Sequence, residues 1–204
     1  MVFYPIETLV MAQITEILLV VGGPHAGDFV RVLKNGKELG VKHLEYAYQE
    51  TEGGIADALR LAEDFADGES VCVILGDNCT DATIQKDVKE FKNGALIFLK
   101  EVPDPERFGV PVFDKKENIQ TIQEKPKNPK SNFAVTGLYM YDNTVFNKIQ
   151  KLKPSDRGEM EITDVNNLYL KEKKLRWTKL KGFWKDAGTF KTLFEVNTYW
   201  AEKD

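Results

Sequence analysis

Apolar and polar positions in the first half of the chain follow two alternating patterns. Ile6, Leu9 and Val10 have the spacing of one helix face, whereas residues 17–21 and 71–75 are continuous apolar runs, typical of strands buried on both faces. Between these runs the sequence predicts helices over 28–34 and 55–66 and a strand over 43–49. Strands that alternate with helices indicate βαβ units, so we expect an α/β fold with a mostly parallel sheet flanked by helices.

The second half of the chain is richer in strands. After a helix over 82–91, the pattern predicts strands over 95–102, 108–113, 119–124 and 133–141, helices over 143–150 and 161–171, and a strand over 175–180. A terminal helix is expected after Thr189, whose hydroxyl can accept a hydrogen bond from a free backbone N–H as an N-cap. No repeat or linker divides the sequence, which predicts a single domain over 1–204 with a mixed sheet.

Composition narrows the class of protein. A chain of 204 residues can bury a core without disulfides or a structural metal, and 28 basic against 32 acidic residues argue against a nucleic-acid or membrane partner. Cys72 and Cys79 are too few for a disulfide scaffold and fit a reducing compartment. Because no apolar run approaches the roughly 18 residues of a membrane-spanning helix, we predict a cytoplasmic protein.

Two aspartates stand where ligands bind in this class of fold. Asp77 directly follows the apolar run 71–75, and Asp186 lies in a turn before the terminal helix. Ligands of open α/β sheets bind outside the carboxyl ends of the strands, and two carboxylates suit Mg²⁺, which leaves its other positions to water and phosphates. Taken singly, each aspartate is better explained as a turn or cap residue, and that alternative stays open at this point.

Eight short segments, in one order along nearly the entire chain, carry a family resemblance. They include Leu75-Gly76-Asp77-Asn78 and Glu124-Lys125-Pro126, and the others are 4–9, 49 with 53–56, 104–110, 134–139, 158–166 and 184–189. By these segments the sequence resembles the glucose-1-phosphate thymidylyltransferases, which are sugar-1-phosphate nucleotidylyltransferases. The resemblance implies a Rossmann-like fold of the nucleotide-diphospho-sugar transferase type. It also implies a homo-oligomer that transfers a thymidylyl group from dTTP to glucose 1-phosphate with Mg²⁺, giving dTDP-glucose and pyrophosphate.

The resemblance assigns the charged groups of the site. Asp77 and Asp186 would hold Mg²⁺ as catalytic residues, and Lys125 would pair with the sugar phosphate. Glu124 would accept hydrogen bonds from the sugar hydroxyls, since a carboxylate can only accept and an ammonium can only donate. Transfer between phosphates depends on positioning and charge neutralisation more than on a covalent nucleophile, so these are the groups such a reaction needs.

The resemblance also assigns groups that contact the substrates. Gln49 would face the edge of the thymine base, and Gly54 would allow the backbone to approach the base closely. Gly109 and Val135 would line the sugar pocket, with Glu161 nearby. From the residues alone, Gln49 is a polar strand end, Gly54 a turn glycine and Glu161 a helix-start carboxylate.

The family pattern differs from this sequence at its start. Family members open with a strand and a glycine-rich loop of the form Leu-Ala-Gly-Gly-x-Gly-Thr-Arg-Leu, followed by Lys-x-Leu-Leu-Pro, and the match here begins beyond them. That loop would supply N–H groups and cations to the triphosphate. Since the first strand normally lies in mid-sheet, we expect two strands left without a neighbour. Strand rearrangement, another chain or a longer gene product would each repair this gap.

Two functional alternatives remain beside the thymidylyltransferase. One is a non-catalytic nucleotide-sugar binding or regulatory homologue that has lost the triphosphate loop. The other is a uridylyltransferase of the same family, because uracil differs from thymine by one methyl group, which gives little discrimination.

Overall fold

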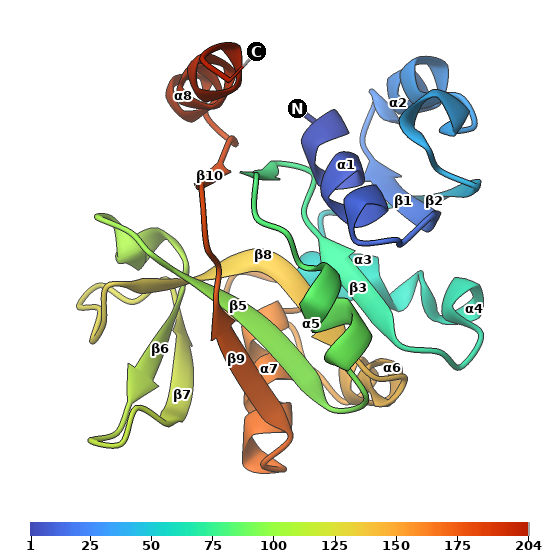
Figure 1. The fold of residues 1–204 in the computed structure, drawn as a ribbon. Helices are drawn as coiled ribbons and strands as arrows, with labels where there is room; N and C mark the ends of the chain where they lie inside the picture. The colour runs from blue at the N-terminus through green and yellow to red at the C-terminus, as the bar shows by residue number, and fades with distance from the viewer. Residues whose placement is uncertain (204) are drawn as a thin grey trace.

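A six-stranded sheet forms the centre of the computed structural model, which describes residues 1–203 (Figure 1). Five strands are neighbours in the order β7 (Ile119–Glu124), β6 (Gly109–Phe113), β8 (Phe133–Tyr141), β5 (Ala95–Glu101) and β9 (Leu175–Lys179), and β3 (Val71–Ile74) pairs with β8. β8 is antiparallel to β3 and β5, and β5 is parallel to β9, so β3, β5 and β9 share one direction. The predicted mixed α/β sheet is confirmed.

Helices cover both faces of this sheet. Alternate residues of a strand point to opposite faces, and in β5 the buried Ile97 and Leu99 belong to a hydrophobic cluster with α3 (Ile55–Arg60), α6 (Thr144–Ile149) and α7 (Ile162–Lys171). Leu96 and Phe98 point the other way and pack near α5 (Gln85–Glu90). The helix predicted over 55–66 is divided into α3 and α4 (Glu63–Ala66), because the N–H groups of Leu61 and Ala62 bond three residues back.

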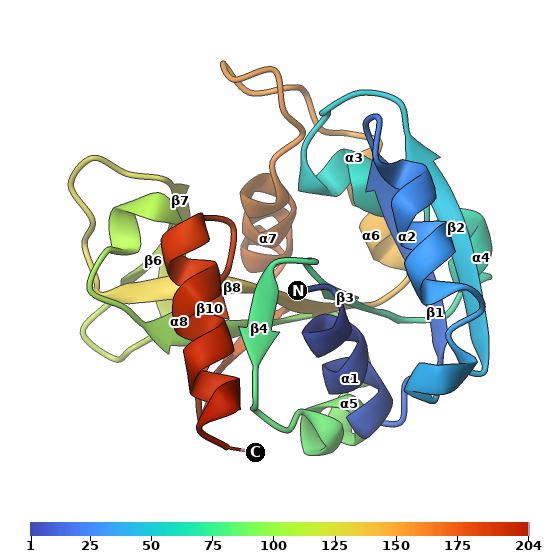
Figure 2. The ribbon, with the colours of Figure 1, turned by 90° about the horizontal axis from the view of Figure 1, so that it is seen from above.

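The N-terminal part of the chain forms a smaller sheet beside the central one. This N-terminal part contains α1 (Phe3–Met11), β1 (Glu16–Gly22), α2 (Ala26–Leu33), a 3₁₀ turn η1 (Lys37–Leu39) and β2 (His43–Gln49) (Figure 2). β1 and β2 form a parallel ladder, and the opening helix is confirmed. Within residues 1–203, β1 pairs only with β2 and β3 only with β8, which confirms the expectation of two strands that each lack a neighbour.

The sequence did not predict the two shortest strands. β4 (Asn78–Thr80) and β10 (Trp184–Asp186) form an antiparallel ribbon of three residue pairs. The segment around Asp186 was expected to be a turn, and no element was predicted over 78–80. Three residues carry no periodic signal, and each of these strands exists only because the other lies beside it.

The C-terminal helix α8 (Phe190–Ala201) packs against the start of the chain (Figures 1 and 2). Its N-cap is confirmed, because the Thr189 hydroxyl accepts a hydrogen bond from the N–H of Thr192 at 3.2 Å. The ring of Trp200 lies 4.4 Å from that of Tyr4 between centroids. Among the helices of residues 1–203, none combines the length and apolar character that a bilayer crossing needs.

Candidate active site

The β4–β10 ribbon brings Asp77 and Asp186 together. Asp186 pairs with Asn78 in the ladder, and the N–H of Ala187 donates to the carbonyl of Asp77 at 2.8 Å. A Cβ placed on Gly188 would lie 2.9 Å from Asp186 Oδ1 and 3.3 Å from Asp77 Oδ2. These two carboxylate oxygens are therefore no more than about 6.2 Å apart, the sum of those distances.

The electrostatics of this pair suit a cation. Burial, and secondly the charge of Asp186, raise the pKa of the Asp77 carboxyl above its usual value. Two carboxylates at a half-buried strand end repel each other, and a divalent ion between them would remove that repulsion. Within residues 1–203 no group of three or more His, Cys, Asp or Glu side chains could hold a metal. An ion here would thus complete its shell with water or phosphate oxygens, as Mg²⁺ commonly does.

A buried amide fixes the orientation of Asp77. Asn78 Nδ2 donates to Asp77 Oδ1 at 2.9 Å, while Asn78 Oδ1 accepts from the N–H of Gly137 and from Trp184 Nε1, both at 2.8 Å. A Cβ on Gly137 would lie 2.6 Å from Asn78 Nδ2, so only glycine allows this approach. Asn78, Gly137 and Trp184 fall inside the segments of the resemblance, but their shared role depends on contacts between distant parts of the chain.

A second group of predicted residues meets where β6, β7 and β8 adjoin. Gly109 pairs with Glu124 on one side and Val135 on the other. Thr163 of α7 donates its hydroxyl to Glu124 Oε2 at 2.5 Å. A Cβ on Gly109 would lie 3.2 Å from Thr163 Oγ1 and 3.6 Å from Glu124 Oε2. The structure thus brings together Gly109, Glu124 and Val135, and it adds Thr163.

Lys125 follows Glu124 in an unusual backbone conformation. Its φ is +41°, in the left-handed region that favours glycine, and its N–H donates to the carbonyl of Phe108 at 3.0 Å. The side chain is exposed beside the loop that precedes Gly109. Strained positions of this kind cluster at functional sites, where the surroundings hold the residue in place.

Arg157 is a site residue that sequence reasoning missed. Its Nε lies 3.4 Å from Glu161 Oε1, its Nη1 lies 3.9 Å from Glu124 Oε1, and it also pairs with Glu159. Glu161 occupies the N-cap position of α7 without capping it, and accepts instead from Ser155 Oγ at 2.8 Å. The matched segment 158–166 begins one residue after Arg157, so the resemblance did not include it. The signal that the sequence did offer was a single arginine among acidic residues.

Gln49 and Gly54 lie close to the segment that leads into Glu161. Gln49 Nε2 donates to Asp57 Oδ2 at 2.8 Å and to the Gly54 carbonyl at 3.2 Å. Gly54 has φ +90°, and a Cβ there would lie 2.8 Å from the carbonyl of Met160. Packing against Met160 therefore already requires glycine at position 54, whatever else binds beside it.

Tyr139 of β8 is affected by the charges of both groups of residues. Burial raises the pKa of its phenol, and the charges of Glu124 and then Asp77 raise it further. Both carboxylates consequently lie within electrostatic reach of one side chain of β8. On the ribbon side, Asp104 is the main cause of a raised pKa at Arg107, and Asp186 adds to it, so a cation also lies near that carboxylate.

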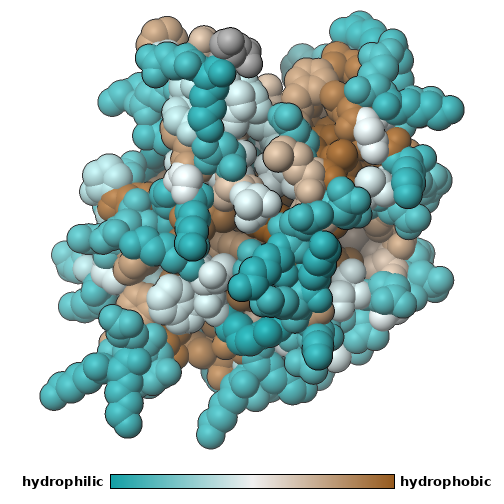
Figure 3. All heavy atoms as spheres, in the orientation of Figure 1, coloured by the Kyte–Doolittle hydropathy of each residue, from teal (hydrophilic) through white to brown (hydrophobic). Residues whose placement is uncertain are grey.

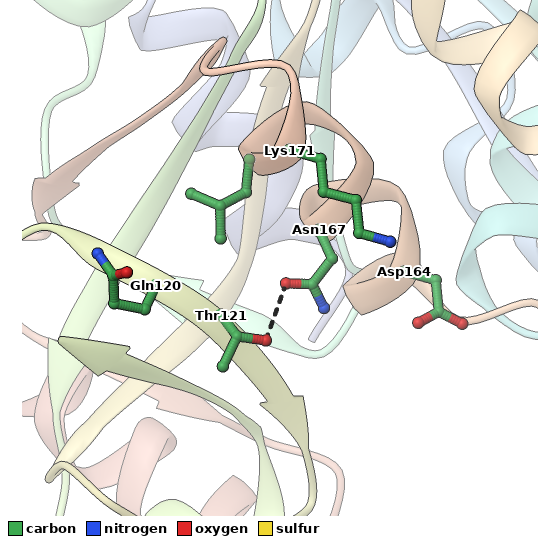
Figure 4. Close-up of a pocket in the computed structure, with 6 residues that line it drawn as sticks. Gln120, Thr121, Asp164, Asn167 and Lys171 are labelled. Carbon is green, nitrogen blue, oxygen red and sulfur yellow. Dashed lines mark hydrogen bonds between the residues drawn. The ribbon is translucent and has the colours of Figure 1, made fainter. Parts of the chain in front are cut away.

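Two hollows are found in the described part of the chain, and only the second borders the site. A groove of about 290 Å³ between β7 and α7 contains no residue predicted for the site; its lining is Gln120, Thr121, Asp164, Asn167, Leu170 and Lys171 (Figure 4). A second hollow, of about 470 Å³, borders the carboxylate pair along Ala187, Gly188 and Thr189, with Met1, Phe190 and Leu193 as its other walls.

The fold is that of the α/β nucleotidyltransferases. A solved structure of UDP-glucose pyrophosphorylase in complex with UDP-glucose superposes with a TM-score of 0.84, covering 99% of this chain and 86% of that one. At 21% identity this likeness shows the fold alone. A family model described as nucleotidyl transferase matches residues 1–203, and the chain belongs to this family of enzymes.

Relatives at higher identity carry one name. A glucose-1-phosphate thymidylyltransferase of Neisseria gonorrhoeae is 40% identical over 205 residues, covering 98% of this chain and 71% of the relative. One from Mycolicibacterium smegmatis is 39% identical over 204 residues, covering 98% and 70%. A crystal structure of a Bacillus anthracis protein assigned the same name, in complex with sucrose, is 46% identical with a TM-score of 0.90, covering 97% of this chain and 81% of that one.

Proposed function

We propose that this protein transfers a thymidylyl group from dTTP to glucose 1-phosphate. A phosphate oxygen of the sugar phosphate attacks the α-phosphorus of dTTP, the bond from that phosphorus to the β-phosphate oxygen breaks, and pyrophosphate leaves. The observation that carries the proposal is the approach of Asp77 and Asp186 to within about 6.2 Å, in a chain that also joins Glu124, Thr163 and Gly109 in one group. The names of the relatives support the choice of substrates.

The chain's own residues would divide this task. Lys125 provides a positive charge for the sugar phosphate, and Glu124, oriented by Thr163, accepts hydrogen bonds from sugar hydroxyls. Gln49 would have to exchange its bond to Asp57 for the thymine edge. Asp77 and Asp186 would hold Mg²⁺, which, when bound, neutralises phosphate charge during transfer. Asn78 keeps the Asp77 carboxylate in one orientation throughout.

The setting of the enzyme is part of the proposal. We infer a cytoplasmic homo-oligomer, and the two free thiols of the described residues, Cys72 and Cys79, support a reducing compartment.

A pyrophosphate-release assay with dTTP, glucose 1-phosphate and MgCl₂ tests the proposal. Asp77→Asn keeps the shape of the side chain and removes its charge, and should lower kcat/KM at least ~100-fold, the scale of losing one electrostatic stabiliser of the transition state. Asp164→Asn is the matched control, an exposed aspartate of α7, and should leave the rate unchanged. An unchanged rate in Asp77→Asn would disprove the metal role of Asp77.

The same assay separates the alternatives. Faster turnover of UTP than of dTTP would indicate a uridylyltransferase. Binding of dTDP-glucose in calorimetry, with no pyrophosphate from any nucleotide, would indicate the non-catalytic homologue.

A further inference from the structure

The hairpin of β6 and β7 has few ladder bonds to the rest of the sheet. Within residues 1–203, β7 pairs only with β6, and the ladder between β6 and β8 has a single residue pair, Gly109 with Val135. At the far end of β6, Phe113 adds ring contacts to Phe133 and Trp177. Figure 3 shows hydrophilic side chains projecting at the lower left, where Figure 1 places the turn between β6 and β7. The position of β7 therefore depends on contacts outside the ladder.

Asn167 of α7 makes such a contact at the free edge of β7. Its Oδ1 accepts from the N–H of Ile122, and its Nδ2 donates to the carbonyl of the same residue, both at 2.9 Å. Figure 4 shows this side chain directed from α7 toward β7, where the Thr121 hydroxyl also donates to Oδ1 at 3.5 Å. A side-chain amide has the donor and the acceptor of a peptide group. Asn167 thus takes the place that a residue of a neighbouring strand would have.

The pairing of β7 with β6 explains why Ile122 needs this partner. Ile122 lies opposite Pro111, which has no N–H to donate. The N–H and the carbonyl of Ile122 both point to the free edge, as in the non-hydrogen-bonded pairs of an antiparallel ladder. Ile122 is only 3% exposed, and buried backbone groups without partners are costly. Without Asn167, β7 would have to move outward until water reached these two groups.

A second contact between α7 and β7 has the spacing of the first. Thr163 and Asn167 are four residues apart on α7 and therefore lie on one face of the helix. The Thr163 hydroxyl donates to Glu124, which lies two residues after Ile122 on β7. Four helix residues rise about 6 Å and two strand residues about 7 Å, so both contacts form in one alignment of helix and strand. A shift of β7 by one residue would break both.

α7 is the fixed side of this contact. Tyr169 is fully buried, and its hydroxyl donates to Asp142 Oδ1 at 2.8 Å. Asn166, also fully buried, accepts from the Tyr141 hydroxyl of β8 at 2.7 Å. These bonds join α7 to β8 and to the residue that follows it. Loss of the Asn167 contact should therefore displace β7 and leave α7 in place.

We propose that Asn167 is a positioning residue for the part of the site that binds the sugar, because it holds β7 where Glu124 reaches Thr163. The inference rests on the proposed function, in which Glu124 accepts hydrogen bonds from the sugar hydroxyls. Lys125 directly follows Glu124, so a displaced β7 would also move the charge proposed for the sugar phosphate. Gln49, proposed to face the base, lies on β2 outside the hairpin. Asn167 therefore acts on the sugar end of a nucleotide sugar and not on its base.

Titration calorimetry with dTDP-glucose and with dTMP tests this inference in the full chain. The two ligands share the base, the deoxyribose and the first phosphate, and only dTDP-glucose carries the glucosyl phosphate. Asn167→Leu removes both bonds to Ile122, and the adjoining groove of about 290 Å³ gives the new side chain room. We expect it to weaken binding of dTDP-glucose about tenfold, the scale of one hydrogen bond to a charged group, and to leave binding of dTMP unchanged.

Two other variants complete the comparison. Asn167→Asp keeps the shape of the side chain but has no donor for the Ile122 carbonyl, and it should show the same selective loss. The two ligands carry similar negative charge, so the added charge of this variant acts on both alike, and it decides the question if Asn167→Leu fails to fold. Asp164→Asn, an exposed residue of the same helix and groove, is the matched control and should bind both ligands as the wild type does.

A double variant tests whether Asn167 acts through Glu124. In a Glu124→Gln background, Asn167→Leu should weaken dTDP-glucose binding less than about threefold further, because residues that act through one contact are not additive. A further loss of the full tenfold would show that Asn167 does not act through Glu124. Amide hydrogen exchange gives the structural readout, since the Ile122 N–H should exchange at least ~10-fold faster in Asn167→Leu.

The outcomes separate this inference from the proposed function. A wild type that does not bind dTDP-glucose would refute the proposed function, and with it the sugar site on which the inference rests. A wild type that binds dTDP-glucose would leave the proposed function standing. In that case, unchanged affinity in both Asn167 variants, or an equal loss for dTDP-glucose and dTMP, would overturn the positioning role alone.

Discussion

Asp77→Asn should make the protein more stable when no divalent metal is present. The substitution removes one of two charges whose oxygens lie no more than about 6.2 Å apart and preserves the acceptor that Asn78 uses. At that separation, repulsion between unit charges is about 0.7 kcal/mol at a dielectric of ~80 and about 2.7 kcal/mol at ~20. Because both aspartates are partly exposed, screening favours the lower end, and we expect a gain of about 1 kcal/mol.

The stability difference between Asp77→Asn and the wild type should depend on pH. The pKa of Asp77 is raised in the folded state, so folding disfavours the ionised carboxyl. The destabilising contribution of the Asp77 carboxyl is absent below its unfolded pKa of about 3.9. It grows as the pH rises from that value to the raised pKa of the folded state, and it is complete above that pKa. The advantage of Asp77→Asn over the wild type should therefore be full at pH 7.5 and shrink as the pH falls toward 4.

Urea unfolding with and without MgCl₂ provides the assay. At tenfold excess over its dissociation constant, a metal bound only by the folded state adds about 1.4 kcal/mol, which the wild type should gain and Asp77→Asn should not. Asp164→Asn should stay within about 0.5 kcal/mol of the wild type in both conditions. Lower stability of Asp77→Asn at pH 7.5, or an equal gain from MgCl₂, would refute the account of the carboxylate pair.

Substitutions at three further positions test separate parts of the structure. Thr189→Ala removes the N-cap of α8 and should cost about 1 kcal/mol in urea unfolding. Gly137→Ala places a Cβ 2.6 Å from Asn78 Nδ2, and should cost about 1–3 kcal/mol and weaken Mn²⁺ binding in titration calorimetry. Lys125→Gly should be about 1 kcal/mol more stable than Lys125→Ala, because only glycine adopts φ +41° without strain, while both raise the KM for glucose 1-phosphate at least ~10-fold.

Much of the fold could be predicted from local patterns. The opening helix, the apolar strands β1 and β3 and the terminal helix after Thr189 follow from periodicity and capping, which depend on neighbours in sequence. The helix over 55–66 was predicted as continuous, and its division into α3 and α4 reflects hydrogen bonds that shift from four residues back to three.

The site could be predicted only in part. The resemblance identified Asp77, Asp186, Glu124 and Gly109, which the structure places in two groups, and it identified Lys125 next to one of them. It did not predict Arg157, whose importance lies in its distances to Glu124 and Glu161, or the use of Gly54 in packing against Met160.

The sequence by itself determined most of the helices and the longer strands, because hydrophobic periodicity and caps act over a few residues. Only the tertiary structure decided that β4 and β10 exist, since each three-residue strand is stable only against the other, more than a hundred positions away. That pairing, held by Asn78, Gly137 and Trp184, sets the distance between the two carboxylates. The chemistry of the site therefore depends on contacts that no local pattern encodes.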